Sequence, residues 1–525
     1  MPDQPTIQEV KKVLIVGAGP IGLAAACFLQ RLGVDFDIID SRSGPVDDSR
    51  ALGVHARTLE FMTMFGLHKE FIRQGNITRY MTFHRFSKPL FRLDFDRIAD
   101  LTDFPFMLIL PQARTERILI KHLFDNGHAI GWETRFVSLT QDEIGVRCRL
   151  ETGSGAVVQD YAYVIGADGA NSQVRAQIGV AFEGETYDAK FLLTEAKIRD
   201  NQLPRNSSHV FMGHSTTVAV LPQPDDIYRI VGPDFQHAAG GTTMVAGEKL
   251  AFSEFQSFLK RENLLTQVTL EHASRLISYR IHKRVAARFQ HQRVFLAGDA
   301  AHIHSPAGGQ GMNTGIHDVM NLGWKIAAVL QSHAHPALLN SYHEERRHAV
   351  KAVVEGADQA MVRVVNRSFW WRHLLDTVAP IVTRWYQPKR LLATMAQLTW
   401  NYREQAVHMD GPLYQPGQRF PNRALSNGQR VHEILGQTPQ PILLVSGADL
   451  QPATEVFRLV AHTKTQLTQR FSEQYQLTQA LTNEQGNPFI GCVMIRPDGY
   501  VLAACPFQQA AVDTAWLSYS PPITA

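Results

Sequence analysis

The 525-residue chain has few cysteines and no long uncharged apolar run. Four cysteines are too few for a disulfide scaffold, and this usage is typical of a reducing compartment, so we expect a cytoplasmic protein. No stretch of about 18 uncharged apolar residues is present, which argues against a membrane span. The polar start, MPDQPTIQEV, shows no signal-peptide core.

Neither sign of charge dominates, because 52 Lys and Arg stand against 49 Asp and Glu, for a formal net charge of +3. Without a dense basic block, no nucleic-acid partner is expected, and no metal site is expected either. We find no internal repeats. The apolar fraction of 44% and charged fraction of 19% are those of a globular protein. A chain of this length predicts roughly two to four domains.

One stretch, Val294 to Ile326, organises the chain. The apolar run Val294–Ala297 predicts a buried strand that ends at Gly298-Asp299. A loop rich in Gly and Pro follows, and helical periodicity resumes from about Met312 to Leu330. This order brings backbone N–H groups and a positive helix end to one point, which suits an anionic or electron-rich ligand edge. Taken alone, the pattern also fits an ordinary strand–loop–helix turn.

The N-terminal region has the pattern of a dinucleotide-binding fold. A predicted strand precedes Gly17, Gly19 and Gly22, an apolar helix follows, and a second strand ends on Asp40 about 20 residues further on. The first glycine makes the turn, the second admits a pyrophosphate, and the third lets helix and strand approach. Asp40 is expected to bind ribose hydroxyls of an adenosine and to repel a 2′-phosphate, which favours FAD or NAD over NADP.

Further along the chain, the pattern predicts a second, mostly β region. Tyr80–Phe86 and Phe91–Phe95 alternate as a hairpin, and short strands between Phe191 and Val231 predict a separate sheet. Lys249–Leu276 is predicted to be mostly helical. A linker-like stretch, Gly411–Gln429, marks a later boundary.

Three motifs stand in order: GxGxxG at Gly17–Gly22, GxDGxxSxxR at Gly166–Arg175 and GDAAH…P…GGQGxN at Gly298–Asn313. Over roughly the first 360 residues, this trio resembles the class A single-component FAD-dependent aromatic hydroxylases, which are para-hydroxybenzoate hydroxylase-like monooxygenases. The C-terminal part resembles the thioredoxin-like domain of the phenol and polyketide hydroxylase branch through its hairpin, IRPDGYVLA. That part lacks a CxxC, so we expect a structural or subunit-contact role for it.

The resemblance implies an α/β fold. A Rossmann-like FAD-binding domain would carry an inserted, mostly β substrate domain and a C-terminal thioredoxin-like domain. The expected FAD-binding domain comprises residues 1–180, with 76–104 contributing to the substrate side, and 281–405, which includes a helical segment. Residues 181–280 are expected to form the substrate-binding sheet and residues 406–525 the thioredoxin-like domain.

The resemblance also assigns cofactor-binding residues. They are Gly17, Gly19, Gly22, Asp40, Arg50, Gln112, Asp168, Asp299, Pro306, Gly309, Gly311, Met312 and Asn313. Arg50 and Gln112 match positions that contact the phosphate and ribityl chain, and Asp299 would hold ribityl hydroxyls. Backbone N–H groups of Gly309 to Asn313 would face the flavin pyrimidine edge. In the family, Asp168 and Arg175 serve both FAD and nicotinamide binding, partly by holding the fold.

The implied reaction is hydroxylation of a phenolic or other electron-rich aromatic substrate by molecular oxygen through a flavin hydroperoxide, with NADH or NADPH as the transient reductant. A polar group should help to deprotonate a phenol. Leu52 stands where some relatives carry a carboxylate, which leaves His55, Tyr228 and His304 as candidates, each with a structural role as the alternative.

Two alternatives stay open. One is a monooxygenase that modifies a polycyclic polyketide or antibiotic, and the other is a non-catalytic FAD-binding sensor. The expected partners are the aromatic substrate and oxygen, and the sequence is compatible with a homodimer.

Overall fold

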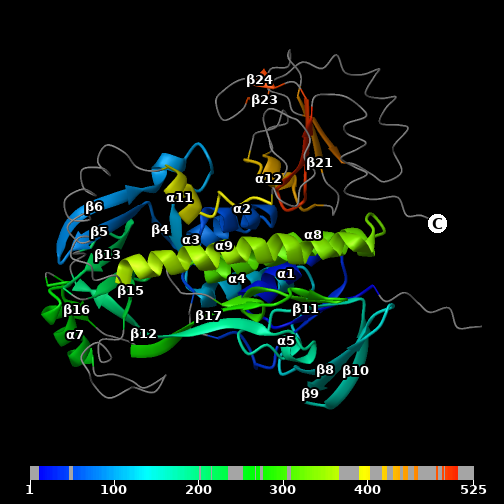
Figure 1. Cartoon of the computed structure of the whole chain (residues 1–525), viewed down its shortest axis with the longest axis horizontal. Coiled ribbons are helices and arrows are strands. Elements are labelled where there is room, and N and C mark those ends of the chain that lie inside the picture. The colour runs from blue at the N-terminus through cyan, green and yellow to red at the C-terminus, as the bar shows by residue number, and fades with distance from the viewer. Residues whose placement is uncertain are drawn as a thin grey trace, which may run out of the picture.

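The structure is a computed structural model that describes most, but not all, of the chain. The described residues are 11–46, 51–199, 203–214, 216–233, 252–266, 268–271, 276–303, 309–365, 389–402, 417–422, 430–437, 442–446, 455–458, 481–482, 488–489 and 491–505. Helices and strands are labelled as in Figure 1.

A parallel sheet of apolar strands lies at the centre of the fold. Its order is β18–β19–β11–β1–β2, where β1 (Val13–Val16), β2 (Phe36–Ile39), β11 (Tyr163–Gly166) and β19 (Val294–Leu296) are parallel and β18 (Gln290–His291) is an antiparallel edge. Every residue of β1, β11 and β19 is buried, as expected for strands covered on both faces. Because the strands are parallel, the segments that follow them leave the sheet at one edge.

Two long helices pack against each other beside this sheet. These are α1 (Pro20–Arg31) and α8 (Gly311–Leu330), and α4 (Gln112–Asp125) packs on α1 as well. Close approach depends on Gly323 of α8, because a Cβ there would lie 2.7 Å from the Phe28 ring of α1. The helix predicted from about residue 312 to 330 is thereby confirmed.

A second sheet has nine strands and is largely antiparallel. Its strands are β5 (Tyr80–Arg85), β6 (Lys88–Asp94), β12 (Phe182–Ile198), β13 (Ser207–Met212), β14 (Thr217–Pro222), β15 (Ile227–Pro233), β16 (Leu270–Glu271), β17 (Leu276–Ala286) and β20 (His302–Ile303). The hairpin predicted at residues 80–95 is confirmed as β5 and β6, and β5 joins this sheet by pairing in parallel with β13. One face of the sheet packs against α7 (Phe252–Arg261) through Phe211, Phe255 and Phe258.

The prediction that residues 249–276 are mostly helical is wrong beyond Arg261. Asn263 and Leu265 adopt positive φ angles of 56° and 52°, which a right-handed helix does not allow. Leu264 and Leu265 are instead buried in the core between α7 and the second sheet.

The remaining elements between residues 53 and 365 lie outside these two sheets. They are β3 (Gly53–Val54), α2 (Ala56–Met64), α3 (His68–Gln74), β4 (Asn76–Thr78), η1 (Phe95–Ile98), β7 (Met107–Ile109), β8 (Arg135–Gln141), β9 (Val146–Thr152), β10 (Gly155–Tyr161), α5 (Gln173–Gln177), η3 (Gly298–Ala300), η4 (Pro336–Leu339) and α9 (Asn340–Val365). Strands β8 to β10 form an antiparallel meander at one corner of the molecule (Figure 1).

The C-terminal part forms an antiparallel sheet of its own, in the order β22–β21–β25–β26. Helix α11 (Lys389–Met395) precedes this part and packs on η1. The elements of the C-terminal part are α12 (Val431–Ile434), β21 (Ile442–Ser446), β22 (Glu455–Arg458), β23 (Leu481–Thr482), β24 (Pro488–Phe489), β25 (Gly491–Ile495) and β26 (Val501–Cys505). The predicted hairpin is confirmed as β25 and β26, and α12 packs on α2 (Figure 1). Within the described ranges, no helix combines the length and apolar character needed to cross a membrane.

Candidate functional site

Three glycine-containing loops meet where the parallel strands end. The Ala167 N–H donates to the Val16 carbonyl (2.8 Å), and the Ala297 N–H donates to the Gly166 carbonyl (2.9 Å). These bonds extend the pairing of β1, β11 and β19 past the strand ends. The motifs that the sequence separates by more than a hundred residues therefore lie side by side, at the edge where α/β folds bind ligands.

The three fingerprint glycines differ in what surrounds them. Gly17 has φ +106°, and a Cβ there would lie 2.4 Å from the Ala167 carbonyl oxygen; at Gly22 it would lie 1.9 Å from the Gly17 oxygen. At Gly19, by contrast, no atom of the described residues would come within 4 Å of an added Cβ. Gly19 is also the N-cap of α1 and has no side chain to cap the helix. An open cradle at a helix N-terminus suits a phosphate.

Asp40 already has protein partners. Its Oδ2 accepts from the Ala18 N–H (2.8 Å) and Arg42 Nη2 (2.9 Å), and its Oδ1 accepts from the backbone N–H and Nε of Arg42 (both 2.9 Å). Burial favours the protonated acid, but the bonds and charge of Arg42 outweigh it and lower the pKa of Asp40. The sequence reasoning missed Arg42, although its place two residues after the acidic position was visible. The ribose contact of Asp40 stays a prediction.

Gln112 connects the first turn of α4 to the segment before β3. Its Oε1 accepts from the Ala51 N–H (3.2 Å), and its Nε2 donates to Glu116 (2.8 Å). Glu116 is 1% exposed, and burial raises its pKa. Arg50, next to Ala51, lies outside the described residues.

Asp168 and Arg175 form a structural link around α5. Asp168 accepts from Ser172 Oγ (2.6 Å) and from the N–H groups of Gln173 (2.7 Å) and Val174 (3.1 Å). Arg175 Nη1 donates to the Ala300 carbonyl (2.8 Å), so α5 holds the segment that follows β19. These contacts support the fold-holding part of the expected role.

Asp299 is exposed at the end of β19, on the η3 turn. The preceding Gly298 has φ +58°, and its N–H donates to Asp318 Oδ2 (2.9 Å). Asp318 is fully buried on α8 and also binds His302 Nε2 (2.7 Å) and Arg346 Nε (2.8 Å). Asp318 was missed, although a lone acid in an apolar stretch of a predicted helix was a usable signal.

Asn313 connects the start of α8 to the start of α2. Its Oδ1 accepts from the His55 N–H (2.9 Å) and Thr58 Oγ1 (2.7 Å), and its Nδ2 donates to the carbonyls of Gly53 (2.8 Å) and Gly309 (2.9 Å). The side chain of Asn313 thus holds two backbone segments, and the expected contact of its backbone N–H with the flavin stays a prediction.

Helix α8 presents its N-terminus at the same edge. The first N–H of α8 that bonds to the preceding turn is that of Thr314, to the Gln310 carbonyl (2.8 Å), and Gln310 does not cap the helix with its side chain. The N–H groups of Gly311, Met312 and Asn313 therefore lie before the helical ladder, as at any helix start. Pro306 and His304, in the preceding loop, lie outside the described residues.

The two described candidates for a proton acceptor differ in position. His55 is the N-cap residue of α2, is 2% exposed and lies beside Asn313. Tyr228 lies on β15 in the core beneath α7, where its hydroxyl donates to the Leu203 carbonyl (2.9 Å). Leu52 is buried. In the part of the chain that the structure describes, no cluster of three or more His, Cys, Asp or Glu side chains could hold a metal ion.

Comparison with known proteins agrees with this geometry. The sequence profile of a family described as "FAD binding domain" matches residues 11–357. Pentachlorophenol 4-monooxygenase from Sphingobium chlorophenolicum is 33% identical over 84% of this chain and 80% of its own length. A 12-dehydrotetracycline 5-monooxygenase/anhydrotetracycline 6-monooxygenase from Streptomyces rimosus subsp. rimosus is 28% identical over 93% of this chain and 94% of its own. The structure of OxyS anhydrotetracycline hydroxylase from Streptomyces rimosus matches with a TM-score of 0.74 at 26% identity, covering 97% of this chain and 99% of that one.

Proposed function

We propose, from the premise that this chain belongs to the FAD-binding-domain family of flavin-dependent monooxygenases, that it hydroxylates a phenolic or other electron-rich aromatic substrate. It is an FAD-dependent enzyme, and NADH or NADPH is its reductant. Bound FAD, once reduced, supplies the reaction with activated oxygen derived from O₂. The protein contributes binding, orientation and electrostatics.

The observation that carries the proposal is the meeting of two uncapped helix N-termini at one edge of the parallel sheet. At α1, the open position around Gly19 would receive the pyrophosphate. At α8, the N–H groups of Gly311 and Met312 would face the ring edge and favour negative charge on it. This donor set fits a dinucleotide that ends in a flat, electron-rich ring. This donor set also supports the FAD contacts that the family resemblance assigns, and those contacts stay part of the proposal.

For the substrate, we infer a place against the face of the second sheet opposite α7. His84 stacks on Phe211, which faces α7, so alternation along β5 turns Phe83 to the other face. There Met81, Phe83 and Leu221 are partly buried and pack toward the core of the parallel-sheet region. An apolar wall of this kind suits an aromatic ring.

The test is oxygen uptake together with NADH and NADPH oxidation by the purified, FAD-loaded protein. A panel of simple phenols and of polycyclic phenols would be compared, with mass spectrometry of the products. We expect one ring class to stimulate oxidation of the nicotinamide and to gain one oxygen atom. Bound FAD with no stimulation by any phenol and no oxygenated product would contradict the proposal and favour the sensor alternative.

A polycyclic substrate is the second candidate. The tetracycline-modifying relative and the OxyS structure cover 93% and 97% of this chain, against 84% for the pentachlorophenol enzyme. These two tetracycline-modifying proteins thus match a larger share of this chain than the pentachlorophenol enzyme does. Higher kcat/KM for the polycyclic half of the panel would select this alternative.

Replacing Tyr228 by Phe tests one proton-acceptor candidate. Burial raises the pKa of Tyr228, and its hydroxyl is already bonded to the Leu203 carbonyl. We expect the variant to lose about 0.5–1.5 kcal/mol of unfolding free energy in urea, because one buried hydrogen bond is removed, and to keep its kcat. A fall in kcat of about 10²–10⁴-fold would instead establish Tyr228 as an acid–base group.

The setting of the enzyme completes the proposal. Cys27 and Cys148 are buried free thiols, as expected for a protein of a reducing compartment. We therefore propose a cytoplasmic enzyme. It would act alone or as a homodimer, without a nucleic-acid partner. The domain boundaries given from the sequence stay predictions.

A further inference from the structure

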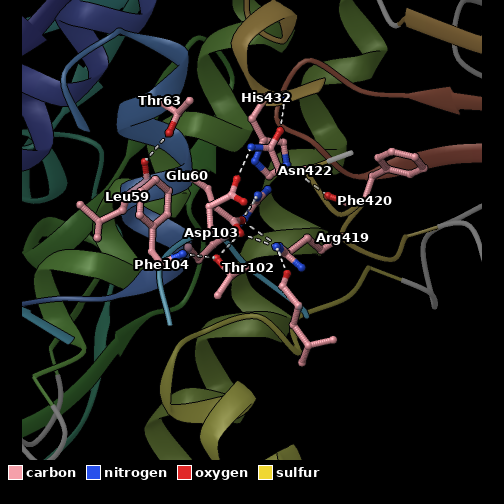
Figure 2. Close-up of polar contacts among 12 residues, drawn as sticks. Leu59, Glu60, Thr63, Thr102, Asp103, Phe104, Arg419, Phe420, Asn422 and His432 are labelled. Atoms are coloured by element: carbon pink, nitrogen blue, oxygen red, sulfur yellow. Dashed lines mark hydrogen bonds and ion pairs between the residues drawn. The ribbon is translucent and has the colours of Figure 1, made fainter. Parts of the chain in front are cut away.

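A cluster of buried charges joins α2 to the C-terminal part of the chain. Glu60 of α2 has no exposed surface, and its Oε2 accepts from Arg57 Nη1 (2.9 Å) and Arg419 Nε (2.8 Å). Its Oε1 accepts from Thr102 Oγ1 (2.9 Å) and from Arg419 Nη2, which makes the Arg419 pair bidentate. Figure 2 shows Arg419 reaching the Glu60 carboxylate from its own segment, with Thr102 beside the same carboxylate.

Arg57 extends this cluster to the turn of the β25–β26 hairpin. It is fully buried, its Nη2 donates to the Asp498 carbonyl (2.6 Å), and its guanidinium lies 5.1 Å from the centre of the Tyr500 ring. Gly499, between them, has φ +79°, and a Cβ there would lie 3.1 Å from Arg57 Nη2. Two separate C-terminal segments therefore contact the same turn of α2.

Keeping these charges buried is favourable only while each one keeps its partner. Burial alone would raise the pKa of Glu60, but the positive charge and hydrogen bonds of Arg419, together with the charge of Arg57, lower it to about 2, so the carboxylate stays ionised. A buried charge that loses its partner is strongly unfavourable, whereas a bidentate Arg–carboxylate pair is well matched in shape. The position of α2 is thus tied to that of Arg419.

Helix α2 in turn holds the start of α8. Its N-cap His55 and its first-turn Thr58 both donate to Asn313 Oδ1, at 2.9 Å and 2.7 Å. Thr58 and Glu60 are two residues apart on one nine-residue helix. A shift of α2 at Glu60 therefore moves the groups that fix Asn313 and, through its bond to the Gly309 carbonyl, the entry to α8.

We propose that Arg419 is a positioning residue for FAD: through Glu60 and α2, it sets the position of Asn313 and of the backbone N–H groups at the start of α8. The C-terminal part then has a role in cofactor binding, beyond the structural or subunit-contact role expected from the sequence. The inference rests on FAD binding and is independent of which substrate the enzyme hydroxylates.

The experiment measures FAD binding by the full-length apoprotein, by quenching of flavin fluorescence, for the wild type and for Arg419→Met. We expect the Kd for FAD to rise about tenfold or more, the range of typical coupling between sites. At saturating FAD, the visible absorption and circular dichroism bands of the bound flavin should shift. Arg419→Lys keeps the charge but loses the bidentate geometry, so its Kd should be intermediate.

The matched control is Arg430→Met. Arg430 also joins the C-terminal part to the segment before β7, through Asp103 at 2.6 Å, but its side chain is 43% exposed and, among the described residues, makes no hydrogen bond or ion pair to α2. Its Kd for FAD should stay within about twofold of the wild type, as expected for an exposed pair. A lower unfolding temperature for Arg419→Met with an unchanged Kd and unchanged flavin bands would overturn the proposal.

Thr102→Val covers the case in which Arg419→Met does not fold. This variant keeps the charges of Glu60 and Arg419 and removes only the neutral hydroxyl that donates to Glu60. Because one hydrogen bond is lost, the Kd for FAD should rise about threefold. An unchanged Kd in this variant would count against the proposal. Because FAD alone is the ligand, inactivity toward every phenol would leave these results unaffected.

Discussion

Gly19→Ala is expected to fold like the wild type and to bind FAD about 10- to 100-fold more weakly. The backbone at Gly19 is extended (φ −77°, ψ −178°), which any residue can adopt, and an added Cβ meets no described atom within 4 Å. The added methyl group would instead occupy the space left for the pyrophosphate, and overpacking of this kind costs about 1–3 kcal/mol. Titration of the apoprotein with FAD, beside circular dichroism and thermal unfolding, measures both effects.

Gly22→Ala is the comparison that separates folding from binding. Its Cβ would lie 1.9 Å from the Gly17 carbonyl oxygen, within the protein itself, so helix α1 and strand β1 could no longer pack. We expect this variant to lose stability or solubility before any effect on FAD affinity can be measured. Wild-type affinity in a folded Gly19→Ala protein would show that the phosphates do not lie at α1.

Asp318→Asn is expected to lower the free energy of unfolding by about 3–5 kcal/mol, the usual result of breaking a buried ion pair from one side. Asp318 is fully buried and binds the Gly298 N–H, His302 and Arg346, and Arg346 is itself fully buried. Neutralising the acid leaves the guanidinium without its charged partner and loosens the turn that carries Asp299. Urea unfolding of the apoprotein at pH 7 measures the loss.

The difference in unfolding free energy between wild type and Asp318→Asn depends on pH through the pKa of Asp318. Burial raises that pKa, but His302 and Arg346 outweigh burial and lower it below the ordinary value of 3.8. A carboxylate with a lowered folded-state pKa contributes its stability above its unfolded pKa and loses it as the pH falls through the folded value. The part of the gap between wild type and Asp318→Asn that comes from the ionisation of Asp318 should therefore be fully present above about pH 5 and narrow below about pH 4.

Glu183→Gln is a suitable control for the urea experiment. Glu183 pairs with Arg347 at 3.6 Å, yet its side chain is 60% exposed. Removing an exposed charge of this kind should change the unfolding free energy by no more than about 0.5 kcal/mol. A loss of similar size in both variants would contradict the assignment of Asp318 to a buried network.

The sequence predicted those parts of the site whose geometry depends only on residues that are neighbours in the chain. The glycine spacing, the strand before it and the helix after it predicted the open position at Gly19, because each glycine acts within its own turn. The β25–β26 hairpin was predicted for the same reason. The helix predicted over residues 249–276 was wrong past Arg261, since periodicity alone does not distinguish a helix from apolar residues that a sheet core buries.

The amino-acid sequence by itself predicted the α/β class and a dinucleotide site, because these depend on short motifs whose geometry is set within one strand, loop and helix. The resemblance of its three motifs to a known family then implied FAD as the cofactor and hydroxylation as the chemistry. The tertiary structure alone decided which charges meet. Arg42 on Asp40 extends the first motif by two residues, but Arg346 on Asp318 and Arg419 on Glu60 join residues that lie 28 and 359 positions apart in the chain. Such pairs leave no periodic trace in sequence, since an ionic contact depends only on where folding places two side chains.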